Sequence, residues 1–239
     1  MKVSLFIPCL VEQFMPEVGI ATAKILSRLG IGLDYPQGQT CCGQPLYKSG
    51  YRAKTVKLAK QFISLFQDAE AVVCPSGSCV AMVRKEYPSL LTHHPSWYNR
   101  ALELGPRVHE LSQFLVNVIG AVDLGAKWSG SAVFHDSCQA LRELGVEEEP
   151  RALLSKVKGL TLVPMERQDL CCGFGGTFSL KFPELSEAMV KEKMGYVTAT
   201  GADWLIGIEP GCLMNMGGYS TKKGLGIQAV HLAQVLASR

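Results

Sequence analysis

Eight of the nine cysteines form two sets that share one order along the chain. Each set contains an isolated cysteine, an adjacent pair followed by glycine, and a last isolated cysteine. The two sets are Cys9, Cys41, Cys42 and Cys79, and then Cys138, Cys171, Cys172 and Cys212. Matching cysteines are separated by a nearly constant 129 to 133 residues. This regularity predicts two copies of a unit of about 120 residues, 1–120 and 121–239.

The adjacent pair distinguishes between kinds of metal site. Zinc ligands are usually spaced as C-x2–4-C, whereas neighbouring side chains point apart and chelate a single ion poorly. A cluster of several irons avoids this difficulty, because the two thiolates can bind different irons. Four thiolates per copy therefore predict one iron–sulfur cluster of the [4Fe–4S] type in each copy. An aerobic preparation would lose these clusters or hold zinc in their place.

Buried structural thiols are the alternative to metal ligands. Thiols of that kind would not be expected to repeat as an adjacent pair with a shared glycine, here Gly43 and Gly173. A glycine at this position permits a positive φ and lets the backbone approach a bulky group closely. The repeated glycine thus favours a bound group over simple packing.

Composition excludes several classes of protein. Nine cysteines in 239 residues fall well below the roughly 8–10% that marks a disulfide scaffold. A net charge of +3 is too small to indicate a nucleic-acid surface. No apolar run approaches the ~20 residues of a transmembrane helix, and Pro8 interrupts the apolar N-terminal run that would resemble a signal peptide. We therefore expect a cytoplasmic protein with reduced thiols.

Strand and helix patterns alternate in both copies. Short apolar runs predict strands, and apolar residues at helical spacing predict helices. The predicted strands are Lys2–Pro8, Ala71–Cys74, Ala132–His135, Leu160–Met165 and Trp204–Ile208, and the predicted helices are Pro16–Leu29, Tyr51–Gln67, Leu185–Thr200 and Gln228–Leu236. The segment Ser89–Gly105 lacks periodicity and is interpreted as an insertion over the join near Gly120–Gly130. This alternation predicts an α/β fold of two pseudo-symmetric βαβ-type repeats, each with a mainly parallel sheet flanked by helices.

The isolated cysteines follow predicted strands. Since the carboxyl ends of parallel strands lie at one edge of a sheet, Cys9 and Cys79 should converge at one edge, and so should Cys138 and Cys212. The Cys-Cys-Gly turn would complete each set. We therefore expect each copy to gather its own four thiols.

The duplicated cysteine pattern resembles the cysteine-rich CCG domain family, which includes the cysteine-rich subunit of heterodisulfide reductase and the glycolate oxidase iron–sulfur subunit. Within that family the chain is most similar to the lactate-utilisation protein A group. The similarity rests on the short length and on Cys42-Gly43-Gln44-Pro45, Ser49-Gly50-Tyr51, Cys172-Gly173-Phe174-Gly175-Gly176-Thr177-Phe178 and Met189-Val190-Lys191-Glu192-Lys193. The resemblance implies iron–sulfur clusters, sometimes non-cubane, and L-lactate oxidation to pyruvate. It also implies two partner subunits, including a larger ferredoxin-type iron–sulfur protein.

The chain departs from the family pattern at the last cysteine of each copy. Several members have Cys-x-x-Cys there, whereas Ser76 and Glu209 occupy the earlier cysteine position in this chain. Cys74 has Gly207 as its counterpart and is either an extra ligand of the first copy or a core thiol. The second copy has at best the carboxylate of Glu209 as a substitute ligand.

Histidines offer further candidate ligands. His135, three residues before Cys138, either ligates iron, moves a proton near a cluster or serves as a structural hydrogen-bonding group. His93 and His94 fit a solvated loop better than a metal site.

Three functions fit these residues. The first is an iron–sulfur electron-transfer subunit of an L-lactate oxidising complex, which needs partners because the sequence contains no site for a hydride-accepting cofactor. The second is an enzyme similar to heterodisulfide reductase that cleaves a disulfide at its cluster. The third is a zinc-stabilised scaffold or assembly module.

Overall fold

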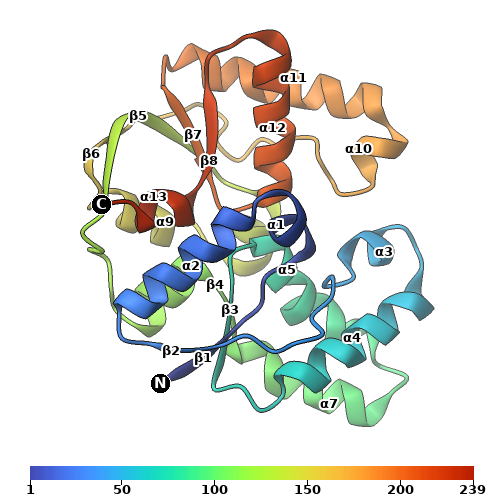
Figure 1. Cartoon of the computed structure of the whole chain (residues 1–239). Coiled ribbons are helices and arrows are strands. Elements are labelled where there is room, and N and C mark those ends of the chain that lie inside the picture. Colours follow the sequence, from blue (N-terminus) through green and yellow to red (C-terminus); the bar gives the residue numbers. More distant parts are fainter.

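The computed structural model describes residues 1–239 and contains two four-stranded sheets (Figure 1). All neighbouring strands are parallel, and the strand orders β2-β1-β3-β4 and β6-β5-β7-β8 are the same. The strands are β1 Lys2–Leu5, β2 Gly32–Asp34, β3 Ala71–Cys74, β4 Val108–Glu110, β5 Lys127–His135, β6 Lys158–Leu162, β7 Trp204–Gly207 and β8 Gln228–His231. The predicted α/β class with two repeated units is confirmed.

Helices flank both sheets. Those of the first half are α1 Cys9–Phe14, α2 Pro16–Arg28, α3 Gln44–Lys48, α4 Arg52–Phe66, α5 Gly77–Ala81, α6 Tyr87–Leu90, α7 Pro95–Leu104 and α8 Leu111–Gln113. Those of the second half are α9 Glu148–Leu154, α10 Phe178–Lys181, α11 Pro183–Ala199, α12 Pro210–Lys223 and α13 Leu232–Ala237. Short 3₁₀ or π segments occur at Met82–Glu86, Gly105–Arg107, Phe114–Val118 and Ala140–Leu144.

The hydrophobic core has three parts, and the largest one joins the two halves. It lies between the sheets and contains apolar side chains of β1, β5, α2, α9 and α13. The second part packs α4, α6 and α7 on the first sheet, and the third packs α11 and α12 on the second. Fully burying one large apolar side chain contributes about 1.5–3 kcal/mol, so the shared core holds the halves in a fixed relation.

Helix α2 illustrates how the sequence directs this packing. Its buried positions include Val18, Ile25 and Leu26, which recur at helical spacing and face the shared core. Pro16 stands at the first turn, where its missing N–H is tolerated. Gly30, at φ +74°, follows the C-terminal end of the helix. The predicted helix Pro16–Leu29 is thus confirmed to within one residue.

Two predicted segments are wrong. Gln228–Leu236 is not one helix, because Gln228–His231 pairs with β7 as strand β8 and only Leu232–Ala237 is helical. The segment Ser89–Gly105 contains helix α7, which packs against α4 and α6 in the first half and does not lie over the join. In both segments the tertiary contacts decide the conformation.

The fourth strand of each sheet ends in a residue that caps the next helix. The Glu110 carboxylate accepts hydrogen bonds from the backbone N–H groups of Ser112 and Gln113, and His231 accepts one from Ala233. The sequences that follow match at an offset of 121: Leu111-Ser112-Gln113-Phe114-Leu115 and Leu232-Ala233-Gln234-Val235-Leu236. This repeat is the signal that would have revealed β4 and β8.

Glu110 makes the stability of the fold pH-dependent. Its side chain has no solvent exposure, and burial raises the pKa of its carboxyl from 4.5 to about 7. The folded state therefore binds this proton more tightly, and the stability it contributes is present below pH 4.5 and lost as the pH rises through about 7.

We expect Glu110→Gln to remove this dependence, because the amide oxygen keeps the cap without a buried charge. On going from pH 4.5 to 8 the variant should gain on the order of 3 kcal/mol relative to the wild type, from about 1.4 kcal/mol per pKa unit. Urea unfolding of both apoproteins at the two pH values measures this change. An equal pH dependence of both proteins would contradict the assignment.

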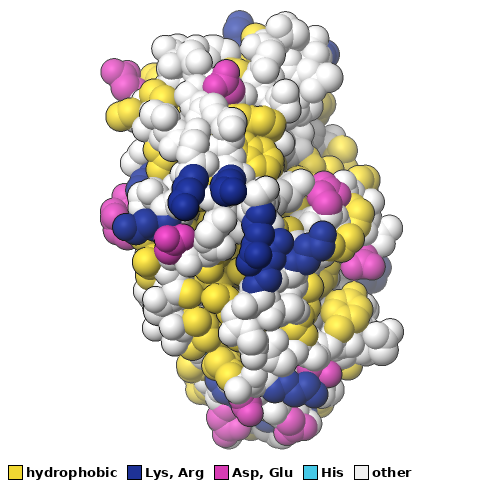
Figure 2. Space-filling view, turned by 60° about the vertical axis from the view of Figure 1, so that its left-hand side comes forward, with side chains coloured by type: hydrophobic (Ala, Val, Ile, Leu, Met, Phe, Trp, Pro, Cys, Tyr) yellow, Lys and Arg dark blue, Asp and Glu magenta, His cyan; other side chains and the backbone are white.

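The outer surface mixes charged and apolar side chains. Figure 2 shows a face on which Lys and Arg side chains gather in a band across the middle, with acidic side chains beside it. Large exposed apolar side chains include Leu180, Phe182 and Leu185, on or beside α10 and the start of α11. None of the helices has the length and apolar character needed to cross a bilayer.

Candidate functional site

All eight repeated cysteines line a single cavity of about 270 Å³. The cavity lies at the carboxyl ends of the central strands, where the chain leaves β1, β3, β5 and β7. Strand β1 pairs with both β2 and β3, and β5 pairs with both β6 and β7. The chain therefore leaves each of these central strands toward opposite sides of its sheet, and open α/β sheets bind ligands at such a point. The expected convergence of each set is observed, and the two sets also face one another.

The first set, which we call the N-terminal quartet, comprises Cys9, Cys41, Cys42 and Cys79. Cys9 begins α1, Cys79 lies in α5, and the adjacent pair precedes α3. The Sγ atoms of Cys42 and Cys79 are 3.5 Å apart. Gly43 has φ +88° and donates its N–H to the Cys41 sulfur at 3.4 Å. The predicted positive φ of this glycine is confirmed.

The C-terminal quartet, Cys138, Cys171, Cys172 and Cys212, repeats this arrangement. The Sγ atoms of Cys172 and Cys212 are 2.9 Å apart, and Gly173 donates its N–H to the Cys171 sulfur at 3.4 Å. Gly173 has φ +80°, and a Cβ atom there would lie 2.7 Å from the carbonyl oxygen of Ser186. Only glycine fits this approach of the turn to helix α11.

The thiols of each quartet are linked by hydrogen bonds that set their acidity. Hydrogen bonds from Cys42 and then Cys9 lower the pKa of Cys41 to about 3. Those from Cys138 and Cys172 likewise lower the pKa of Cys171. The pKa values of the donating thiols Cys9, Cys42, Cys138 and Cys172 are raised. None of the cysteines forms a disulfide. The pKa of Cys79 is also lowered, so the N-terminal quartet favours two thiolates and the C-terminal quartet favours one, which is the form that binds metal.

Ser76 and Glu209, which both line the cavity, hydrogen-bond to one another between the two halves. The Glu209 carboxylate accepts hydrogen bonds from the Ser76 hydroxyl at 3.1 Å and from the N–H and hydroxyl of Ser78, both at 2.8 Å. Burial raises the pKa of the Glu209 carboxyl to about 7. This carboxylate therefore joins the two halves and caps the start of α5.

Cys74 stands apart from the quartets. Its side chain is fully buried, belongs to the aromatic-rich core of the first half and does not line the cavity. Its thiol donates to the Ser76 carbonyl oxygen at 3.7 Å, and a hydrogen bond between Cys74 and Cys79 helps to lower the pKa of Cys79. This position fits a core thiol beside the quartet.

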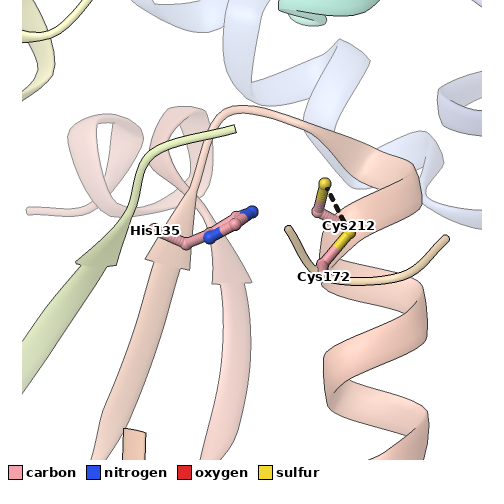
Figure 3. Close-up of side chains that lie close together, drawn as sticks. All are labelled: His135, Cys172 and Cys212. Atoms are coloured by element: carbon pink, nitrogen blue, oxygen red, sulfur yellow. Dashed lines mark hydrogen bonds between the residues drawn. The ribbon is translucent and has the colours of Figure 1, made fainter. Parts of the chain in front are cut away.

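The histidines differ in their surroundings. His93 is exposed, and His94 lies 3.3 Å from the Lys60 ammonium. His135 is only 1% exposed, and its ring lies beside Cys172 and Cys212 (Figure 3). These three side chains place ligand atoms within 4.8 Å of one another. Of the histidines considered from the sequence, the structure brings only His135 to a quartet.

Comparison with known proteins agrees with this geometry. The model of the CCG cysteine-rich domain family matches residues 3–84 and 132–217, which contain both quartets. The chain belongs to the CCG cysteine-rich domain family. Two relatives named "Lactate utilization protein A" align over the full length of both chains. They come from Geobacillus kaustophilus, with 49% identity, and Bacillus subtilis, with 50% identity. The predicted family resemblance is confirmed.

A solved structure shares the fold. A hypothetical protein from Helicobacter pylori has a TM-score of 0.59 and 12% sequence identity. The match covers 98% of this chain and 48% of that one. At this identity the likeness concerns the fold alone.

Several residues that hold the cavity together escaped the sequence analysis. Gln44 donates to the Ser78 carbonyl and to the Gln139 side chain, and Ser49 bonds to Thr177 across the halves at 2.9 Å. Gln44, Ser49 and Thr177 lie within the CCG-like motifs, which is the signal that could have singled them out. Lys193, also in a motif, is completely buried on the apolar face of α11.

Proposed function

We propose that this protein is an iron–sulfur electron-transfer subunit that takes part in the oxidation of L-lactate to pyruvate. One observation carries the proposal: two quartets of free thiols face a single cavity at the sheet edges. Full-length relatives with the name lactate utilization protein A support the choice of substrate.

The donor set fits one iron–sulfur cluster per quartet. Each quartet offers four thiol sulfurs, and the adjacent pair suits a group with several irons better than a single ion. A [4Fe–4S]-type cluster would supply one-electron transfer at each quartet. The chain's own residues hold and shield it: Gly43 and Gly173 direct their N–H groups to ligand sulfurs, which tunes the basicity of those sulfurs.

The reaction requires partners, because the 2-hydroxy acid must lose two electrons and two protons, and the electrons must reach an acceptor. We propose two partner subunits, one of them a larger ferredoxin-type iron–sulfur protein, and a cytoplasmic location. A tagged copy purified without air from its native cells should retain such a protein. Recovery of the chain alone, with oxidation of its reduced form by a disulfide, would instead favour the disulfide-cleaving enzyme.

Metal analysis tests the cofactor. After anaerobic purification or reconstitution we expect about eight irons and eight acid-labile sulfides per chain, four of each for every quartet. Electron paramagnetic resonance of the reduced protein should show cluster signals. Fewer than about two irons with no cluster spectrum in any redox state would overturn the proposal, since the smallest common cluster holds two. Stoichiometric zinc without sulfide would identify the scaffold instead.

A further inference from the structure

A pair of neighbouring buried positions beside the quartets differs in character between the two halves. Phe6 and Phe62 stack edge to face in the first half, with ring centroids 4.9 Å apart. At an offset of 129, Phe6 corresponds to His135. Phe62 corresponds to Lys193 at an offset of 131. The same offset relates the neighbours of the two turn glycines: Thr55 and Leu58 lie beside Gly43, and Ser186 and Met189 lie beside Gly173. An apolar pair in one half is thus a polar pair in the other.

His135 is a buried polar side chain without hydrogen bonds. Both ring nitrogens lie out of contact with solvent, and neither has a hydrogen-bond partner. Buried polar groups in folded proteins are nearly always hydrogen-bonded, so an unpaired one calls for an explanation. One ring nitrogen faces the sulfurs of Cys172 and Cys212 (Figure 3), and the three ligand atoms lie within 4.8 Å of one another. The imidazole nitrogen is therefore close enough to these sulfurs to bind the same metal centre after small side-chain movements.

A buried lysine holds the chain beside the imidazole. Lys193 donates to the carbonyl oxygens of Arg167 at 3.0 Å and Gln168 at 2.8 Å, which holds the loop before Cys171. The Gln168 carbonyl also lies beside the imidazole. A metal-ligating histidine usually has such a carbonyl near its other ring nitrogen.

We propose that His135 is a nitrogen ligand of the metal centre held by the C-terminal quartet, which makes the two centres of the chain chemically different. The inference rests on the proposed function, because it assigns a ligand to one of the proposed clusters. The N-terminal quartet has no such donor, since Phe6 occupies the matching position. Imidazole ligands raise the reduction potential of an iron–sulfur centre compared with thiolates alone. The C-terminal centre is therefore the better electron acceptor of the two.

Isotope labelling tests the ligand in the unaltered protein. The reconstituted, reduced wild type should show the strong coupling of a directly bound nitrogen in pulsed electron paramagnetic resonance. Growth on ¹⁵N-histidine should convert this signal to that of ¹⁵N. His135→Phe should lose the nitrogen coupling while the signal of the N-terminal quartet stays, and the exposed control His93→Gln should keep both. Cluster signals without strongly coupled histidine nitrogen would overturn the inference and leave the proposed function intact.

Binding of Co²⁺ to the anaerobic apoprotein gives a second measurement that needs no cluster. We expect two equivalents to bind, and His135→Phe should weaken one of them at least about tenfold, since even loss of an outer partner costs 10–100-fold in metal affinity. The absorption bands of that equivalent should also shift. Unchanged affinities and spectra would overturn the assignment of His135, whereas a chain that binds neither iron nor cobalt would overturn the proposed function as well.

Discussion

Replacing Cys172 by serine is expected to remove about half of the iron and acid-labile sulfide from the anaerobically purified protein. Cys172 is buried, lines the cavity and lies 2.9 Å from the Cys212 sulfur at the centre of the C-terminal quartet. A serine hydroxyl has nearly the same shape but does not provide a thiolate, so the fold is kept and the ligand is lost. The N-terminal quartet contributes its own four sulfurs and should keep its cluster.

The equivalent change in the other half provides the matched comparison. Cys42→Ser should also remove about half of the iron, with loss of the complementary set of electron paramagnetic resonance signals. The double variant should hold almost none. Loss of all iron in either single variant would show that the quartets share one centre, which would contradict one cluster per repeat.

Cys74→Ala separates ligands from core thiols. Cys74 is as buried as Cys42 but does not line the cavity. We expect the full iron content together with a small loss of stability, because only a buried sulfur is removed. Iron loss in this variant would instead assign Cys74 as the extra ligand of the N-terminal quartet.

The cysteine spacing was sufficient to predict the quartets, because a duplicated pattern places matching residues at matching points of one fold. The structure confirms that Cys9 and Cys79 follow neighbouring parallel strands and that Cys138 and Cys212 do the same. It adds that both quartets face one cavity. This relation depends on how the halves pack through α2, α9 and α13, which no local pattern in the sequence reveals.

Short strands are the elements that the sequence pattern predicts least well. Strands β2 and β4 contain three residues each, too few to establish a period of two. Strand β8 runs directly into α13 without a loop between them. The apolar residues of the two elements together therefore have the spacing of one helix. Pairing between Gly207 and His231 decides the conformation there, and that contact joins residues far apart in the sequence.

The pairing of Ser76 with Glu209 is equally hidden in the sequence. In the sequence each residue stands out only as a departure from Cys-x-x-Cys, yet their side chains meet between the two halves. A change that looks like a lost ligand in the sequence is a contact between halves in the structure. The sequence indicates which positions are unusual, and the packing of the halves determines what those residues do.

Two glycines of helix α12 should respond oppositely to alanine. A Cβ atom at Gly211 would lie 2.4 Å from a ring carbon of Phe174, whereas one at Gly218 would meet nothing within 4 Å. Gly211→Ala therefore forces the Phe174 ring to move and should destabilise the protein by about 1–3 kcal/mol. Gly218→Ala should stabilise it by roughly 0.5–1 kcal/mol, because alanine restricts the unfolded chain without strain in the helix.

Thermal unfolding of the apoproteins measures this contrast. At about 2–4 °C per kcal/mol for a chain of this size, Gly211→Ala should lower the Tm by roughly 2–12 °C and Gly218→Ala should raise it by roughly 1–4 °C. Because Phe174 lines the cavity and Gly211 precedes Cys212, Gly211→Ala should also change the electron paramagnetic resonance signals of the reconstituted protein. Only the signals of the C-terminal quartet should change. Equal shifts of Tm in both variants would show that Phe174 yields freely. The close packing around this quartet would then play no part in holding its ligands.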